Sequence, residues 1–248
     1  MRHSGILVKF FPIDTMLKAI LLLKPYIRKS EIMRINDTIP NLSVVTDQGS
    51  FDLHDWVSNS WAILFSHPKD FTPVCTTEFS AVARLSSEWE KRGTKVIGVS
   101  VDGVEEHKRW KGDIEVVAEV PARFPIIADE GLAVSKAFDM LPADAYMPDG
   151  RTPADSATVR SVFIIGPDKK IKLMMTYPMT VGRNFGEVMR ALDACQTSTR
   201  MGVATPADWN MGEDVIIPPT VSNEAATEKF GDFETILPYL RKTKMPLL

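Results

Sequence analysis

Short apolar runs and amphipathic stretches alternate along the chain from about residue 39 onward. Five runs have the length and composition of buried strands, at residues 61–65, 95–101, 124–128, 159–165 and 171–177. The last two flank the turn sequence GPDKK, which predicts a hairpin. A lead-in strand at 39–45 and a return at 51–53 flank the turn sequence DQGS and predict a second hairpin.

Amphipathic stretches between these runs predict helices at residues 76–92, 104–117, 132–140 and 184–195. In the first of them, apolar side chains recur every three or four residues and share one face, as Phe79, Val82, Leu85 and Trp89 do. Strand and helix alternate first, and then a hairpin and a last helix follow. This order predicts an α/β fold with a mixed central sheet flanked by helices.

The pattern changes after about residue 200. The segment from there to the end is interrupted by proline, moderately apolar and too short to build a core of its own. It either packs back on the preceding domain or covers a partner subunit, and we favour the second. We therefore expect one domain at residues 33–200 and a C-terminal dimer-contact region at residues 201–248.

Composition narrows the class of protein without naming a function. The 248 residues are 44% hydrophobic and 25% charged, as in ordinary globular proteins, and the formal net charge is -3. This balance argues against a nucleic-acid partner, because basic residues are scattered rather than clustered. The apolar run at residues 16–23 is too short for a membrane span, so we expect none.

Residues 1–32 form an extension ahead of the regular pattern. From residue 1 to residue 30 it carries six basic residues and a single acid, Asp14. An acid-poor, basic composition is typical of a mitochondrial presequence, although this one is poor in serine and arginine. The alternative is a non-native start ahead of Met33. We favour the second and expect a cytoplasmic protein, with a mitochondrial location as the alternative.

The two cysteines, Cys75 and Cys195, are too few for a disulfide-stapled secreted domain, so we expect a reducing compartment. Cysteine and histidine show no zinc-site spacing, and we expect neither a metal nor a cofactor.

Cys75 follows an apolar strand and two prolines, at the point where an amphipathic helix begins. Unpaired N–H groups and the positive end of the helix dipole favour the thiolate, which is the nucleophilic form. Thr72 can aim its hydroxyl at the sulfur, and Pro68 and Pro73 stiffen the loop.

These residues resemble the active site of the peroxiredoxins. Pro68, Thr72 and Cys75 match the spacing of the peroxidatic motif, here within HPKDFTPVCTTE. Further matches to the family are Arg160, the active-site arginine; Glu78, which orients it; His67, typical of the one-cysteine subfamily; and Arg183, the second arginine, within TYPMTVGRNF. VATPADW, at residues 203–209, also resembles that subfamily, some members of which are also phospholipases. The similarity runs from about residue 34 to residue 244.

The resemblance implies a thioredoxin-like fold and a thiol peroxidase active in antioxidant defence and redox homeostasis. The Cys75 thiolate would attack a hydrogen peroxide or organic hydroperoxide and become a sulfenic acid, while Thr72 bonds the sulfur and the peroxide. Arg160 and the helix N–H groups would stabilise the thiolate and the developing charge. An external thiol, glutathione or thioredoxin-type, would recycle the enzyme, with ascorbate also open. A homodimer is the family expectation.

Two further positions decide the subfamily. Thr205 stands where two-cysteine relatives carry their resolving cysteine. Cys195 shares the apolar stripe of Val188 and Leu192, so we expect it to be a buried structural residue.

Three residues, His54, Ser60 and Asp168, match the catalytic trio of the phospholipase members. The glycines that flank the serine in those members are missing here, so we expect no lipase activity.

Overall fold

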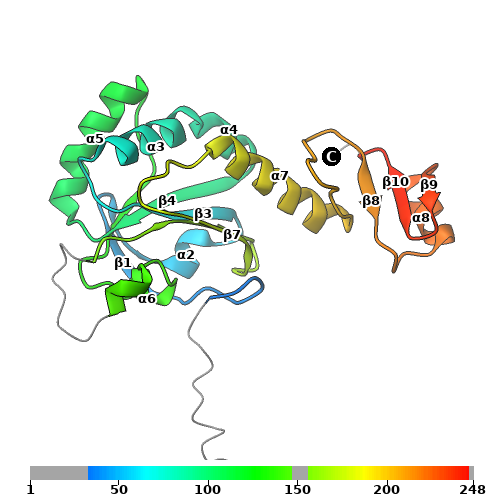
Figure 1. The fold of residues 1–248 in the computed structure, drawn as a ribbon, viewed down its shortest axis with the longest axis horizontal. Helices are drawn as coiled ribbons and strands as arrows, with labels where there is room; N and C mark the ends of the chain where they lie inside the picture. The colour runs from blue at the N-terminus through cyan, green and yellow to red at the C-terminus, as the bar shows by residue number, and fades with distance from the viewer. Residues whose placement is uncertain (1–32, 147–155, 246–248) are drawn as a thin grey trace, which may run out of the picture. The chain divides into compact units, whose positions relative to one another are not determined.

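The computed structural model describes residues 33–146 and 156–245 (Figure 1). The possible presequence at residues 1–32 lies outside these ranges. The main sheet has seven strands in the order β2-β1-β5-β4-β3-β6-β7. Their bounds are β1 Ser43–Thr46, β2 Gly49–Asp52, β3 Trp61–Ser66, β4 Thr94–Ser100, β5 Ile126–Ala128, β6 Arg160–Ile165 and β7 Ile171–Tyr177.

The sheet is mixed, as the alternation of elements predicts. β3 pairs in parallel with β4, and β4 with β5, whereas β6 is antiparallel to β3 and to β7. The central strand β3 is fully buried, because its alternate side chains face two hydrophobic cores. Trp61, Ile63 and Phe65 belong to one core, and Ala62 and Leu64 to the other.

Helices cover both faces of this sheet (Figure 1). The core that contains Phe65 is completed by helices α3, α4, α5 and α7, whose buried side chains include Phe79, Trp89, Trp110 and Val188. The opposite core is completed by α2 and α6. The bounds of the helices are α2 Leu53–Val57, α3 Pro73–Arg84, α4 Ser86–Lys91, α5 Val104–Ala118, α6 Ala133–Ala137, the 3₁₀ helix η2 Ala143–Tyr146, α7 Phe185–Met201 and α8 Asn223–Phe230. This architecture agrees with the predicted thioredoxin-like fold.

The helices differ in detail from the prediction. The stretch expected as one helix at residues 76–92 is two helices, because Leu85 leaves the helical conformation at φ -88 and ψ 8. Trp89 still faces the same core after the break, and its indole N–H donates to the carbonyl of Val82 at 3.1 Å. The helix expected at 132–140 is confined to α6, α7 extends beyond residue 195, and α2 was not predicted.

The C-terminal segment contains a small antiparallel sheet, in the order β8-β10-β9, which the sequence did not predict. Its strands are β8 Val215–Ile217, β9 Glu234–Leu237 and β10 Leu240–Thr243. Trp209 is fully buried in a cluster with Met201, Val203 and Val215. Across residues 33–146 and 156–245, no helix is both long and apolar enough to cross a membrane.

Candidate active site

Cys75 lies in the first turn of α3, and the local sequence explains why the helix begins there. Pro73 begins the helix, since a missing N–H is tolerated there, and Thr72 precedes it in the extended conformation. The first bond of the helix runs from the N–H of Thr76 to the carbonyl of Thr72, at 3.0 Å. The N–H groups of Val74 and Cys75 therefore have no acceptor within the helix. They lie at the positive end of the helix dipole, in the same turn as the buried Cys75.

Arg160 lies next to the sulfur. One of its terminal nitrogens, Nη1, is 3.4 Å from Sγ of Cys75 and 2.7 Å from a carboxylate oxygen of Glu78. Its Nε donates to the carbonyl of Met179 at 2.7 Å, which fixes the plane of the guanidinium. Arg160 begins β6, which runs antiparallel to β3, so it meets the loop that leaves the end of β3.

A second guanidinium lies behind the first. Arg183 donates to Glu78 through its backbone N–H, its Nε and its Nη2, at 2.7, 2.9 and 2.7 Å, and its Nη1 donates to the carbonyl of Ser161 at 2.9 Å. The Arg183 guanidinium also stacks over Phe65 and Phe185, at 5.2 and 5.5 Å from the ring centres. The carboxylate of Glu78 thus holds two arginines in fixed positions.

The charges in this network are shielded from water. Burial alone would raise the pKa of Glu78, but its hydrogen bonds and ion pairs with Arg183, together with the charge of Arg160, outweigh burial and lower that pKa. Burial lowers the pKa of Arg183, and Glu78 opposes that change. One carboxylate and two guanidiniums leave one positive charge uncompensated, next to the sulfur of Cys75.

The loop between β3 and α3 carries the other expected residues. His67 and Pro68 are buried, and Thr72 is partly exposed. The hydroxyl of Thr72 donates to the carbonyl of Lys69 at 2.9 Å, rather than to the sulfur. Its oxygen still offers lone pairs to a donor entering the site. Phe71 adopts a left-handed conformation with φ 55, an uncommon one for a bulky residue, between the anchored Asp70 and Thr72.

Two residues of this region were missed by the sequence reasoning. Asp70 bonds both His67, at 2.7 Å, and His107, at 2.6 Å, and all three side chains are buried. The available signals were weak: His107 falls on the apolar stripe of its helix, and Asp70 lies within the peroxidatic motif. His67, Asp70 and Asp102 have potential ligand atoms within 4.8 Å of one another. Nε2 of His67, both oxygens of Asp70 and Oδ2 of Asp102 make hydrogen bonds within the protein.

Cys195 is partly buried rather than fully buried as expected, and it packs against the edge of the main core. Burial raises the pKa of its thiol, opposed by Lys172 and Arg190. It lines a cavity of about 440 Å³ between β7, α7 and residues 205–208. A thiol that is reluctant to ionise is a poor nucleophile.

The three residues that match the phospholipase trio bond other groups. Nε2 of His54 lies 2.7 Å from the carbonyl of Ile39. Asp168 is exposed and pairs with Lys172 at 2.7 Å. Ser60 donates its backbone N–H to Val57. Within the described ranges, no hydrogen bond joins these three residues to one another.

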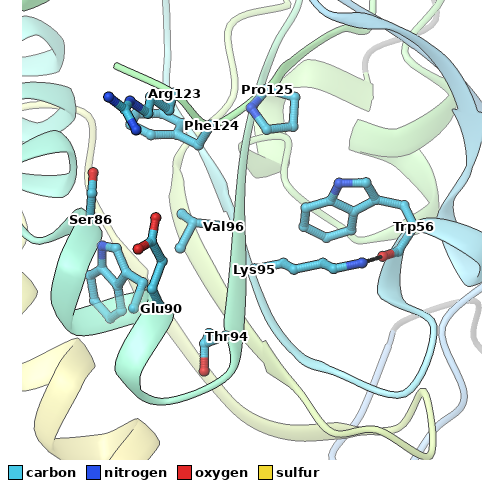
Figure 2. Close-up of a pocket in the computed structure, with 10 residues that line it drawn as sticks. Trp56, Ser86, Glu90, Thr94, Lys95, Val96, Arg123, Phe124 and Pro125 are labelled. Atoms are coloured by element: carbon cyan, nitrogen blue, oxygen red, sulfur yellow. Dashed lines mark hydrogen bonds between the residues drawn. The ribbon is translucent and has the colours of Figure 1, made fainter. Parts of the chain in front are cut away.

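An aromatic cavity of about 300 Å³ lies elsewhere on the domain (Figure 2). Trp56, Trp89 and Phe124 supply its apolar walls, and Lys95 crosses it to reach the carbonyl of Trp56 at 2.6 Å. It opens beside the start of β4, whereas Cys75 follows the opposite end of the parallel strands. None of the expected site residues lines it.

Known proteins are similar to this chain in sequence and in fold. The chain matches the AhpC/TSA family over residues 35–174 and the C-terminal domain of 1-Cys peroxiredoxin over residues 194–232. The mitochondrial peroxiredoxin PRX1 of Saccharomyces cerevisiae is 50% identical over 215 residues, which are 86% of this chain and 81% of the relative.

Solved structures agree with the sequence comparison. Peroxiredoxin 6 of Arenicola marina has a TM-score of 0.79 at 42% identity, covering 86% of this chain and 99% of that one. A yeast mitochondrial 1-Cys peroxiredoxin has a TM-score of 0.78 at 49% identity, covering 86% and 100%. With a buried cysteine at a helix start, an arginine against its sulfur and these matches over most of its length, the chain belongs to the one-cysteine peroxiredoxins, which are thiol peroxidases.

Proposed function

We propose that Cys75 is the peroxidatic cysteine of this peroxidase. The observation that supports this assignment most directly is the 3.4 Å contact between Nη1 of Arg160 and Sγ of Cys75. The contact lies at a helix start that offers free N–H groups. Both features stabilise a thiolate, and both remain in place as negative charge moves from sulfur to oxygen.

The reaction is a displacement at oxygen. The Cys75 thiolate attacks the hydroxyl oxygen of the hydroperoxide, an S–O bond forms, and the O–O bond breaks. The departing oxygen leaves as an alkoxide or hydroxide and takes a proton, which gives alcohol or water. Cys75 is oxidised to a sulfenic acid as the peroxide is reduced.

Each neighbouring residue has a distinct role in this proposal. Arg160 contacts the sulfur and the developing charge, and the free lone pairs of Thr72 accept a hydrogen bond from the peroxide. Glu78 and Arg183 are positioning residues, because they act through Arg160. Pro68 stiffens the loop, and His67 ties its start to Asp70 through a hydrogen bond.

The sulfenic acid is then reduced by an external thiol. Thr205 occupies the position of a resolving cysteine, and burial raises the pKa of Cys195, so neither supports an internal disulfide. The yeast relative is described as resolved through glutathione and thioredoxin systems. We propose the same class of reductant here, with hydrogen peroxide and organic hydroperoxides as substrates.

Assembly and location complete the proposal. Residues 33–200 form the peroxidase domain, and residues 201–248 make dimer contacts in a homodimer. Exposed Ile236, Leu237 and Tyr239 in the C-terminal sheet support such a contact, because large apolar side chains are covered in stable dimers. The basic, acid-poor extension and the mitochondrial relative favour a mitochondrial protein over the cytoplasmic one first expected.

One experiment tests the assignment of Cys75. The reduced protein is mixed with one equivalent of hydrogen peroxide and analysed by mass spectrometry, for the wild type, Cys75→Ser and Cys195→Ser. We expect a sulfenic acid at residue 75 in the wild type and in Cys195→Ser, and no reaction in Cys75→Ser. A disulfide between Cys75 and Cys195 would overturn the one-cysteine mechanism. Oxidation of Cys75 no faster than that of free cysteine would overturn its role.

A further inference from the structure

The backbone pairing of β3 with β6 ends beside the active site. The last paired positions of the two strands are Phe65 and Val162. Beyond them the chain leaves β3 and enters the loop to α3, where the backbone N–H of His67 donates to the carbonyl of Val99, in β4, at 3.0 Å. Arg160 lies two residues before Val162, so the pairing with β3 does not reach it.

The hydroxyl of Ser66 joins the two segments where this pairing ends. It donates to the carbonyl of Val159 at 2.5 Å and accepts from the backbone N–H of Ser161 at 2.9 Å. A carbonyl can only accept and a backbone N–H can only donate, so both bonds of the hydroxyl are determined by its partners. These partners are the two neighbours of Arg160 in the chain. Ser66 is fully buried, so water does not compete for the two bonds.

A second hydroxyl makes a connection in the opposite direction. Thr158 lies two residues before Arg160, and its hydroxyl donates to the carbonyl of His67 at 2.8 Å. Both Thr158 and His67 are fully buried. Ser66 thus reaches from the end of β3 to the backbone around Arg160, and Thr158 reaches from the segment before β6 to the start of the loop. We call Ser66 and Thr158 together the hydroxyl clamp.

The hydroxyl clamp joins the two segments that carry the reacting pair. Arg160 places Nη1 at 3.4 Å from Sγ of Cys75. Its guanidinium is held by the carbonyl of Met179, which accepts from Nε at 2.7 Å, and by Glu78, which accepts from Nη1 at 2.7 Å. These two bonds fix the orientation of the guanidinium. The clamp fixes where the backbone of Arg160 lies relative to the loop that leads to Cys75.

We propose that Ser66 and Thr158 are positioning residues, whose hydroxyls hold the backbone of Arg160 against the start of the loop and so set the contact between its guanidinium and the sulfur of Cys75. This inference rests on the proposed function, because it requires Cys75 to be the oxidised residue. Both hydroxyls donate to backbone carbonyls, so they act through Arg160 and not on the peroxide. A misplacement of about 1 Å in a reacting pair can slow a reaction about 100-fold.

Stopped-flow measurement of the first oxidation by hydrogen peroxide, on the full-length protein, tests this inference with matched variants. Thr158→Val keeps the shape of the side chain and removes the hydroxyl, whereas Thr158→Ser keeps the hydroxyl. We expect the rate constant to fall about ten- to hundredfold in Thr158→Val and in Ser66→Ala, and to stay within about threefold of the wild type in Thr158→Ser. Ser80→Ala is the control and should oxidise at the wild-type rate, because the equally buried hydroxyl of Ser80 donates to the carbonyl of Ile114 at 3.2 Å, in α5.

A merely structural role is separated by repeating the substitutions in Arg160→Met. If the hydroxyls act through Arg160, neither Ser66→Ala nor Thr158→Val should slow the oxidation of Arg160→Met further, within about twofold. Each should still lower the urea midpoint of that variant, because buried backbone groups lose a partner. A general loosening of the fold would instead slow both backgrounds by the same factor.

The outcomes distinguish this inference from the function beneath it. A wild type that forms no sulfenic acid at Cys75 would overturn both. Normal oxidation of Cys75 with unchanged rate constants in Thr158→Val and Ser66→Ala would overturn the inference alone, and so would equal slowing in the wild-type and Arg160→Met backgrounds. The comparison of Thr158→Val with Thr158→Ser decides this even if Ser66→Ala does not fold.

Discussion

Replacing Arg160 by methionine removes the cation nearest to the reacting sulfur while keeping much of the side-chain volume. Three contacts are lost, at 3.4 Å to Sγ of Cys75, 2.7 Å to Glu78 and 2.7 Å to the carbonyl of Met179. Arg183 still neutralises Glu78 through its own three bonds, so the carboxylate is not left unpaired. The variant should therefore fold, with its loss concentrated on the cysteine.

The geometry sets the size of the effect. At 3.4 Å and an effective dielectric constant of about 20, a guanidinium and a thiolate attract by about 5 kcal/mol. The negative charge of Glu78, bonded to the same nitrogen, offsets part of this. Loss of a preorganised donor to a charged transition state costs about 3–4 kcal/mol in other enzymes. We therefore expect the rate constant for oxidation of Cys75 to fall about 100- to 1,000-fold.

Stopped-flow measurement of the first oxidation under single-turnover conditions gives this rate constant without the recycling thiol. Arg160→Lys keeps the charge but cannot bond all three partners at once, so it should fall between wild type and Arg160→Met. Arg84→Met is the matched control, because exposed Arg84 contacts the carbonyl of Val117 away from the site. An Arg160→Met protein with a native urea midpoint and a rate within about threefold of wild type would refute the electrostatic argument.

Three further predictions concern other parts of the molecule. Cys195→Ser should keep full peroxidase turnover with an external thiol, and normal first oxidation with lost turnover would contradict this. Glu78→Gln leaves two buried arginines without their carboxylate and should lower the free energy of unfolding by about 3–5 kcal/mol in urea titrations. Because the pKa of Glu78 is lowered in the folded state, its contribution to the free energy of unfolding is present near neutral pH and lost in acid. The wild type should therefore lose more stability than Glu78→Gln as the pH falls below the ordinary glutamate range. Trp209→Ala should cost about 3–5 kcal/mol within the C-terminal cluster and weaken self-association in gel filtration, while first oxidation of Cys75 continues.

The main sheet was predictable because its central strands are buried on both faces. A strand such as β3, with every residue buried, has to be apolar throughout, and such runs stand out from amphipathic helices. The small C-terminal sheet gave no such signal. Its strands have three or four residues, and β9 is exposed along its whole length, so no alternation of apolar and polar positions marks it.

The break between α3 and α4 was hidden for a different reason. Phe79, Val82, Leu85 and Trp89 keep helical spacing through the break, because all four still face one core. A local change of backbone conformation at Leu85 ends α3. The N–H of this residue donates to the carbonyls of both Ala81 and Val82. Apolar spacing reports which face is buried, and it does not report a one-residue change of backbone conformation.

For the site, the sequence alone predicted a thiol at the start of a helix, and the structure confirms the helix start, whereas Arg160 came only from the family resemblance. Arg160 is 85 positions from Cys75, and only the antiparallel pairing of β6 with β3 brings the two together. The hydroxyl of Ser66 fixes this meeting point, since it donates to the carbonyl of Val159 and accepts from the N–H of Ser161. Local spacing holds no information about such a pairing.

The buried hydrogen-bonded residues His67, Asp70 and His107 show the same limit of sequence-based prediction. Asp70 comes from the loop before α3 and His107 from the first turn of α5, and each alone resembles an ordinary polar residue on its element. Their hydrogen bonds depend on one another. The carbonyl of Ile127 can only accept, so it determines which nitrogen of His107 carries a hydrogen, and the Asp70 carboxylate then constrains the ring of His67. A sequence pattern can place a histidine near a cysteine, but its tautomer depends on partners from three separate segments. The hydrogen-bonding pattern of His67 is therefore a property of the assembled fold rather than of the motif that contains it.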